Sequence, residues 1–211
     1  MDEPKQTIRR GYDLVSTTYR SEDFDFQSSG YRKYLDWVRD HTGPGTSVLD
    51  LGCGCGIPVA SQLGSRGCEV LGIDISPVQI ERARRLVPQA RFLCGDAMEA
   101  DLGSDTFDLV VAFYSIIHFP LSEQPSLLKR IGGWVKPGGL FLGTIGPDRD
   151  PGHVEEDWLG VPGATMFWSH EDPEFYRETL MSSGFRIDRE DVLVDSGGHR
   201  HPVLLAERVD S

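Results

Sequence analysis

The pattern of apolar and polar positions predicts two helices in the first 45 residues. Four apolar residues recur at the spacing of one helical face: Ile8, Tyr12, Val15 and Tyr19. A second apolar face over residues 31–38 ends at the run Thr42-Gly43-Pro44-Gly45, whose glycines and proline stop a helix. We therefore expect residues 1–45 to form an N-terminal helical cap.

Beyond residue 45, apolar runs alternate with amphipathic stretches, which is the pattern of β-α-β units. Five runs predict strands: 48–51, 69–73, 91–94, 107–113 and 140–145. The helices predicted between them include 57–66, 123–135 and one that starts with Ser76-Pro77-Val78-Gln79, a capping box. Repeated strand–helix alternation implies a parallel, doubly wound sheet with right-handed crossovers.

The end of the chain departs from this alternation. Residues 146–170 show no clear period and are expected to form a long loop, and a segment of that kind is often functional. A helix over 173–183 and two strands over 186–194 and 202–207 follow, and the short turn 196–199 makes the strands a hairpin. The fold class is therefore α/β, a single domain over 1–211 with helices on both faces and one antiparallel strand at the end of a mostly parallel sheet.

The composition is typical of a globular domain and bears on the compartment in which the protein is expected. Apolar residues make up 39% and charged residues 26% of the 211 residues. No apolar run is long enough to cross a membrane, and the N-terminus lacks the pattern of a signal peptide, so we expect a cytoplasmic protein. The cysteines, Cys53, Cys55, Cys68 and Cys94, lack the spacing of a zinc site and are expected to be small buried thiols.

The net charge argues against nucleic acid as a partner. Lys and Arg number 21 against 33 Asp and Glu, which gives a formal net charge of −12. A nucleic-acid surface needs basic residues that neutralise phosphates, and no run of Lys or Arg exceeds two residues. We therefore expect a small-molecule substrate and no membrane or nucleic-acid partner. The oligomeric state does not follow from the sequence.

The run V-L-D-L-G-C-G-C-G-I over 48–57 holds the clearest functional signal. A buried strand leads into three glycines at alternate positions, and glycine allows both positive φ and close approach of a ligand. Ile57 stands where a dinucleotide fingerprint needs its third glycine, and the lysine and hydroxyl of a phosphate loop are absent. Pro58 suits the first turn of the following helix.

Two carboxylates follow the next two strands. Asp74 lies 22 residues beyond Gly52, where a carboxylate accepts the hydroxyls of a ribose, and Asp96 follows the third strand. In open α/β sheets, ligands bind at these carboxyl ends. The spacing of Asp74 alone also suits NAD, so a NAD-dependent oxidoreductase stays an alternative.

From Tyr12 to Glu207, five motifs in order resemble the class I S-adenosylmethionine (SAM)-dependent methyltransferases, which have a Rossmann-like fold. V-L-D-L-G-C-G-C-G is similar to their first motif, V-L-G-I-D-I-S to the acidic second and F-L-C-G-D-A to the third. F-D-L-V-V-A-F-Y-S-I-I-H-F resembles their fourth strand and K-P-G-G-L-F-L the fifth. The N-terminal Y-D-L-V-S-T-T-Y resembles an element of many small-molecule methyltransferases, with Ser16 in place of alanine.

The resemblance implies SAM as cofactor and S-adenosylhomocysteine as product. Gly52 and Gly54 would admit the methionine part, with Asp50 at its amine. Asp74 would bind the ribose, with Ile75 against the adenine. The remaining cofactor contacts implied are Asp96 and Ala97 at the adenine edge, Phe113 beneath the sulfonium and Tyr19 from the N-terminal helix.

The reaction implied is in-line methyl transfer to an O or N nucleophile of a small organic molecule. Positioning supplies much of the acceleration, and His118 is the candidate base or substrate contact. Substrate contacts are expected from Tyr12 and, in the loop 146–170, from Trp158, Met166 and Trp168. We expect no metal, because the loop lacks ligand spacing. The alternatives are a protein or tRNA methyltransferase and a SAM-fold scaffold or partner subunit without methyl transfer.

Overall fold

The computed structural model describes residues 3–195 and 197–209. Ser196, part of the predicted turn 196–199, lies outside the described residues. The chain divides into two compact units: unit 1 comprises residues 1–100 and 154–167, and unit 2 comprises residues 101–153 and 168–211. A single domain over 1–211 stays a prediction.

Seven strands form one sheet in the order β3-β2-β1-β4-β5-β9-β8. Their bounds are Ser47–Leu51 (β1), Glu69–Asp74 (β2), Arg91–Cys94 (β3), Phe107–Ala112 (β4), Val135–Thr144 (β5), Phe185–Val194 (β8) and Arg200–Arg208 (β9). Neighbouring strands β1 to β3, and β4 with β5, are parallel, whereas β9 is antiparallel to both β5 and β8. The predicted fold class, a doubly wound α/β sheet that ends in an antiparallel hairpin, is confirmed.

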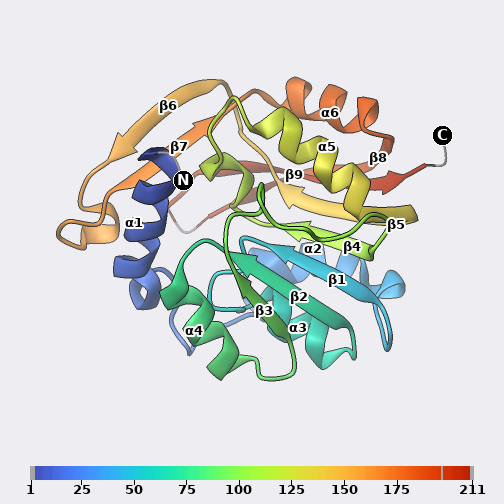
Figure 1. Cartoon of the computed structure of the whole chain (residues 1–211), viewed down its shortest axis with the longest axis horizontal. Helices are drawn as coiled ribbons and strands as arrows, with labels where there is room; N and C mark the ends of the chain where they lie inside the picture. The colour runs from blue at the N-terminus through green and yellow to red at the C-terminus, as the bar shows by residue number, and fades with distance from the viewer. Residues whose placement is uncertain (1–2, 196, 210–211) are drawn as a thin grey trace. The chain divides into compact units, whose positions relative to one another are not determined.

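Unit 1 carries the helices of the predicted N-terminal cap. They are α1 (Glu3–Tyr19), α2 (Gly30–Trp37) and the short 3-10 helix η1 (Arg39–His41). The helices α3 (Val59–Ser65) and α4 (Pro77–Leu86) follow β1 and β2 and pack against the strands of this unit, as Figure 1 shows for α4 beside β2 and β3. Helix α1 packs on α4 and buries Ile8 and Val15, whereas Tyr12 and Tyr19 are partly exposed.

Two details at the starts of helices in unit 1 differ from prediction. Ser76 caps α4 by accepting a hydrogen bond from the backbone N–H of Gln79, as expected. The Gln79 side chain does not complete the capping box, because its Oε1 accepts a hydrogen bond of 2.8 Å from the Ser16 hydroxyl of α1. Pro58 lies one residue before α3 rather than inside its first turn.

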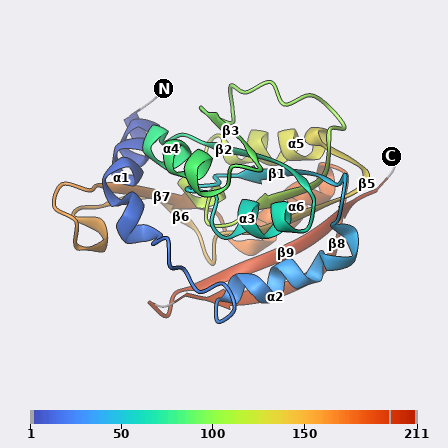
Figure 2. The same cartoon turned by 90° about the horizontal axis from the view of Figure 1, so that it is seen from below.

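Unit 2 contains η2 (Ile116–His118), α5 (Gln124–Trp134) and α6 (Pro173–Ser182). Helix α5 packs on β4, β5 and α6, and α6 packs on β8. Figure 2 shows the long strands β8 and β9 side by side. Asp172 caps α6 by accepting a hydrogen bond from the Phe175 N–H, so a local signal fixes the start of this helix.

The prediction that residues 146–170 form a loop without secondary structure is wrong. They contain β6 (Asp150–Glu155), the 3-10 helix η3 (Trp158–Gly160) and β7 (Met166–His170), and β6 and β7 form a two-stranded sheet of their own. Strand β6 gives no sequence signal because Pro151 and Gly152 interrupt it and nearly all its residues are exposed.

The cysteines and the helices bear on two further expectations. Cys53, Cys55 and Cys68 are buried free thiols, but Cys94 is exposed, so the expectation of four buried thiols is wrong at that position. Burial raises the pKa of Cys53 well above its ordinary value, which keeps this thiol protonated. Within residues 3–195 and 197–209, no helix is both long and apolar enough to cross a membrane.

Candidate functional site

The parallel register of unit 1 brings the sequence-predicted residues to one edge of its strands. Leu51 at the end of β1 lies opposite Ile73, and Asp74 at the end of β2 lies opposite Cys94. The three carboxyl ends are therefore level, and the residues after them share an edge. The backbone N–H groups of Gly52 and Cys53 both donate to the Ile73 carbonyl, at 2.8 and 3.0 Å, which fixes the start of the glycine loop.

The glycine loop adopts a conformation that side chains oppose. The φ angles of Gly52 and Gly54 are +71° and +52°, in the left-handed region where an L-residue costs roughly 1–2 kcal/mol. A Cβ atom placed on Gly54 would meet nothing nearer than Gln79 Cδ, at 4.0 Å. The loop therefore presents bare backbone to open space, as close approach of a ligand requires.

Asp50 is a buried carboxylate with unused hydrogen-bonding capacity. Its side chain is nearly inaccessible, with a relative exposure of 3%, and its Oδ2 has no hydrogen-bond partner among the described residues. Burial and the neighbouring charge of Asp74 raise the pKa of Asp50 to about 7, against the opposing effect of a hydrogen bond from the Ala60 N–H. A donor from a ligand, a water molecule or an ion would satisfy a buried acceptor of this kind.

Asp74 is held by the backbone on both of its oxygens. Oδ2 accepts a hydrogen bond of 2.8 Å from the Gly54 N–H, and Oδ1 accepts one of the same length from the Ser76 N–H. Burial raises its pKa to about 6, although hydrogen bonds from the backbone N–H groups of Ser76, Gly54 and Ile75 favour the ionised form. A carboxylate has about four lone-pair sites, so Asp74 can still accept a hydrogen bond from a ligand.

Asp96 has a partner that sequence reasoning missed. Its Oδ2 forms an ion pair of 2.7 Å with the ammonium of Lys5 on α1, and both side chains are less than a tenth exposed. Its Oδ1 accepts a hydrogen bond from the Met98 N–H at 2.8 Å. Ala97 beside it is buried and Ile75 after β2 is partly exposed. A contact of these residues with adenine stays a prediction.

Three aromatic residues of unit 1 form a cluster. The ring centroids of Tyr12, Tyr19 and Trp158 lie 5.4 to 5.6 Å apart in each pair. Burial raises the pKa of both tyrosines, so their hydroxyls stay protonated donors. Met166 is completely buried, and a Cβ atom on Gly11 of α1 would lie only 2.8 Å from its methyl group. Met166 therefore packs beneath α1.

Unit 2 places a second set of predicted residues near the end of β4. Phe113 and His118 are both buried. The His118 ring lies against Trp168, with centroids 4.4 Å apart, and His153 stacks on the same indole at 6.4 Å. Trp168 therefore contacts two imidazoles, and the three rings form an aromatic group at the junction of η2 with the β6–β7 sheet.

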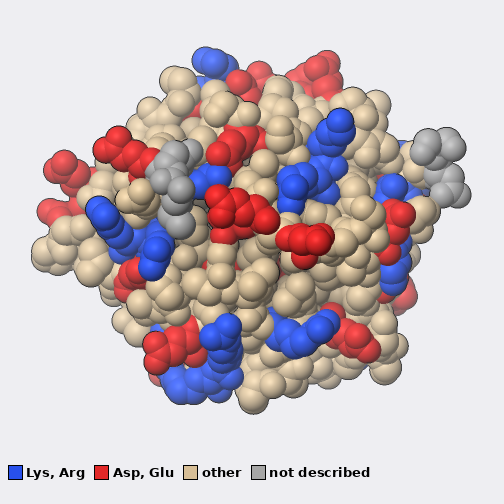
Figure 3. Space-filling model, in the orientation of Figure 1, with Lys and Arg blue, Asp and Glu red and all other residues tan. Residues whose placement is uncertain are grey.

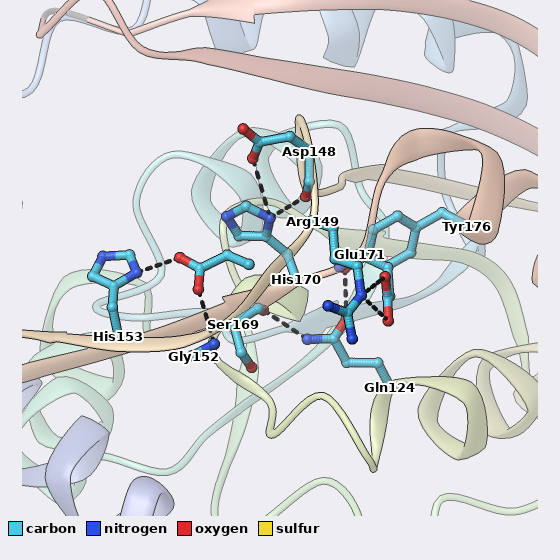
Figure 4. A network of polar contacts seen from close by, with 10 residues as sticks. Gln124, Asp148, Arg149, Gly152, His153, Ser169, His170, Glu171 and Tyr176 are labelled. Atoms are coloured by element: carbon cyan, nitrogen blue, oxygen red, sulfur yellow. Dashed lines mark hydrogen bonds and ion pairs between the residues drawn. The ribbon is translucent and has the colours of Figure 1, made fainter.

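A hydrogen-bond network, drawn in Figure 4, anchors this part of the β6–β7 sheet. The amide nitrogen of Gln124 donates to the carbonyls of Ser169 and Phe119, at 2.7 and 2.8 Å. Its Oε1 accepts a hydrogen bond of 2.5 Å from the Tyr176 hydroxyl. Ser169 follows Trp168 and Phe119 follows His118, so Gln124 fixes the backbone beside both stacked rings.

The same network holds the two histidines of the β6–β7 sheet. His153 Nδ1 contacts Asp150 Oδ2, and the other Asp150 oxygen accepts from the Gly152 N–H at 2.8 Å (Figure 4). His170 Nδ1 donates to the Asp148 carbonyl at 2.5 Å. Within the described part of the chain, no group of three or more His, Cys, Asp or Glu could hold a metal ion.

The electrostatics of unit 1 favour a cationic ligand. The charge of Asp74 raises the cost of ionising Asp50, and the ammonium of Lys5 forms an ion pair with Asp96. A group that carries positive charge would relieve this repulsion, whereas a pyrophosphate would increase it. Glycine loop, buried carboxylates and strand order together define a Rossmann-like domain of the methyltransferase class.

Comparison with known proteins agrees with this assignment. Residues 48–139 match the family model described as a methyltransferase domain. The chain is 32% identical over 154 residues to the 2-methyl-6-phytyl-1,4-hydroquinone methyltransferase of Synechocystis sp., covering 69% of this chain and 48% of that protein. It is 35% identical over 148 residues to an aklanonic acid methyltransferase of Streptomyces sp., covering 66% of this chain and 65% of that one. The chain therefore belongs to the class I SAM-dependent methyltransferase family.

The fold is shared with solved structures of that family. A crystal structure of magnesium protoporphyrin IX methyltransferase from Synechocystis with bound SAM superposes with a TM-score of 0.74 at 20% identity, covering 99% of this chain and 98% of that one. A ribosomal protein L11 methyltransferase of Ralstonia nicotianae is 38% identical over 113 residues, 53% of this chain and 36% of its own length. The chain thus spans between about a third and two thirds of the length of these curated relatives.

Proposed function

We propose that this chain binds SAM through unit 1 and transfers its methyl group to a small organic molecule. Two observations carry the proposal: the buried Oδ2 of Asp50 has no hydrogen-bond partner among the described residues, and the backbone of Gly54 faces open space. An ammonium group supplies the donor that this oxygen lacks. A sulfonium also suits a site with two buried carboxylates, whereas the anionic pyrophosphate of NAD does not.

The residues present fit the other parts of the cofactor. Asp74 keeps acceptor capacity for a ribose hydroxyl, and the backbone fixes its orientation. We assign Ile75, Asp96 and Ala97 to the adenine and Tyr19 to the N-terminal side of the cofactor. Phe113 is assigned to the sulfonium. When bound, SAM carries an activated methyl group, so this chain has to orient the acceptor and exclude water.

The acceptor is proposed to be a small molecule with an O or N nucleophile. Tyr12, Trp158 and Met166 from unit 1 and Trp168 from unit 2 are the proposed substrate contacts, and His118 is a proposed contact with the acceptor. The named relatives that act on a hydroquinone and on aklanonic acid support this choice. Figure 3 also supports a small-molecule acceptor over a nucleic acid, because on the face shown the basic side chains are interspersed with acidic ones.

Calorimetry with S-adenosylhomocysteine tests the cofactor assignment. We expect saturable binding that Asp74→Ala weakens by roughly 30-fold, about 2 kcal/mol for the loss of one hydrogen bond to an ionised group. Glu99→Ala removes an exposed carboxylate from the same unit and is expected to leave the affinity unchanged. Binding of NAD in place of S-adenosylhomocysteine would overturn the assignment.

Tritiated SAM tests the acceptor class. The protein and tritiated SAM are incubated in three separate reactions. The first contains a small-molecule extract, the second a ribosomal protein fraction and the third a tRNA fraction. We expect label in the extract. Label in protein or tRNA would favour the corresponding alternative, and tight binding of S-adenosylhomocysteine without label in any fraction would favour a scaffold or partner subunit.

A further inference from the structure

Asp195 and His201 form an aspartate–histidine pair in unit 2. Asp195 Oδ1 accepts hydrogen bonds from the backbone N–H groups of Gly197 and His199, both at 2.9 Å. Its Oδ2 lies 3.2 Å from Nε2 of His201 and 3.1 Å from Nδ1 of His199. The backbone thus fixes the carboxylate, and the carboxylate fixes the imidazole of His201, whose side chain is 13% exposed.

The contact with Asp195 determines which nitrogen of His201 is basic. A carboxylate accepts hydrogen bonds, so Nε2 carries the proton in the neutral ring and Nδ1 holds the free lone pair. Nδ1 is buried and has no hydrogen-bond partner among residues 3–195 and 197–209. A buried nitrogen in this state is a proton acceptor without a donor, as the base of a catalytic pair would be in the absence of its substrate.

The surroundings of His201 point to a ligand. Because Thr144 at the end of β5 pairs with Val203, His201 lies at the carboxyl edge of β4 and β5. Its ring packs edge-on against Tyr114, with centroids 4.7 Å apart. Tyr114 has a φ of +56°, a strained value for a residue other than glycine, and its N–H is held by Thr144 Oγ1 at 2.6 Å. The next residue, Ser115, also has a buried hydroxyl without a partner among the described residues.

We propose that His201, oriented by Asp195, is the general base of the methyl transfer and that the acceptor is a hydroxyl group such as a phenol. This inference rests on the proposed function. Nδ1 takes the proton of the hydroxyl as its oxygen bonds to the methyl carbon. The carbon–sulfur bond breaks with its electron pair left on sulfur, and the imidazolium beside Asp195 later releases the proton to water. His118, whose ring lies against Trp168, is then a packing or substrate contact and not the base.

The charges around His201 keep it neutral near pH 7. Burial lowers its pKa below the ordinary 6.5, and His199 and His170, which lower it further, are opposed by Asp195. Tyr114 is a further titratable side chain packed against the ring. Activity is therefore expected to fall as the pH drops through the pKa of His201, because the protonated ring cannot accept a proton.

Nuclear magnetic resonance of the ring nitrogens tests the pair without an acceptor. In the protein labelled with ¹⁵N-histidine, we expect His201 to show the Nε2–H tautomer and to titrate below the ordinary histidine pKa of 6.5. The signals that disappear from the spectrum of His201→Gln are those of His201. An Nδ1–H tautomer, or a titration above 6.5, would overturn the proposal.

The rate of tritium transfer into a small-molecule extract tests the role in catalysis. We expect His201→Gln to lower the rate by roughly 100-fold and to abolish its fall at acid pH. His199→Gln should keep the rate near neutral pH and move its acid fall to higher pH, because His199 lowers the pKa of His201. Asp195→Asn should lower the rate by less than His201→Gln does. Affinity for S-adenosylhomocysteine and the unfolding midpoint report whether each variant is folded. Equal rates for wild type and His201→Gln would overturn the assignment of His201 as the general base but not the proposed function. The absence of labelled product with the wild type would overturn the proposed function.

Discussion

Asp50 should make the ligand-free protein less stable as the pH rises, and Asp50→Asn should remove that effect. The carboxylate has an ordinary pKa of 3.8, which burial and Asp74 raise to about 7 in the folded state. The folded protein therefore holds this proton more tightly than the unfolded chain. Its stabilising effect is complete below the unfolded pKa and is lost as the pH rises through the folded pKa.

The size of this loss of stability follows from the shift in the pKa of Asp50. A rise of about three pKa units lowers the free energy of unfolding by roughly 4 kcal/mol at pH values above both the unfolded and the folded pKa. Between pH 5 and pH 8, the wild type should lose about 2.5 kcal/mol of unfolding free energy relative to Asp50→Asn. Constant contributions, such as the buried amide group that asparagine introduces, cancel in this difference between two pH values.

Urea denaturation of the ligand-free protein at pH 5 and pH 8 measures the difference. Glu99→Gln, which alters an exposed carboxylate of the same unit, should follow the wild type at both pH values. Asp50→Asn should also weaken binding of S-adenosylhomocysteine by about 10-fold or more, since it removes a charged acceptor. Parallel stability profiles for wild type and Asp50→Asn would refute the reasoning, because they would mean that Asp50 ionises at its ordinary pKa.

Two further predictions concern a turn and a buried network. Gly54→Ala should cost about 1–2 kcal/mol through backbone strain and should also weaken S-adenosylhomocysteine binding, whereas Gly45→Ala, with a φ of +83° and open surroundings, should cost as much without any change in affinity. Equal affinities for the two variants in calorimetry would contradict a role for the glycine loop. Gln124→Met removes three hydrogen bonds and should lower the unfolding free energy by about 3 kcal/mol in urea, because it leaves the Ser169 carbonyl and the Tyr176 hydroxyl buried without that partner. Gln27→Met, at an exposed position, should have little effect, and an equal loss in both variants would argue against the network.

The sequence predicted the elements that depend on local signals. The glycine loop, the strands before it and after it, and the cap Ser76 follow from turn chemistry and from periodicity within a few residues. Asp74 could be proposed as a site residue for the same reason, because its place at a strand end is fixed by the strand itself. Asp50 is proposed from the resemblance of its segment to the first methyltransferase motif.

Residues that depend on distant partners could not be predicted in this way. Lys5 and Asp96 are 91 positions apart, and Gln124 reaches a carbonyl 45 positions away. The only sequence signal for His201 is its place just after a glycine-rich turn that carries a second histidine. The aspartate that fixes its tautomer lies across that turn, so the geometry of the hairpin determines the pair.

The sequence by itself therefore determined the strands and helices outside residues 146–170, the glycine loop and the carboxylates after the strands, because these follow from hydrophobic spacing and backbone preferences. The sheet formed by β6 and β7 did not follow from it. The tertiary structure alone decided which polar groups found partners. It gave Asp96 the ammonium of Lys5, left Asp50 Oδ2 without a donor among the described residues and paired His201 with Asp195. The physical reason is that burial and hydrogen bonding depend on segments that meet only when the chain folds.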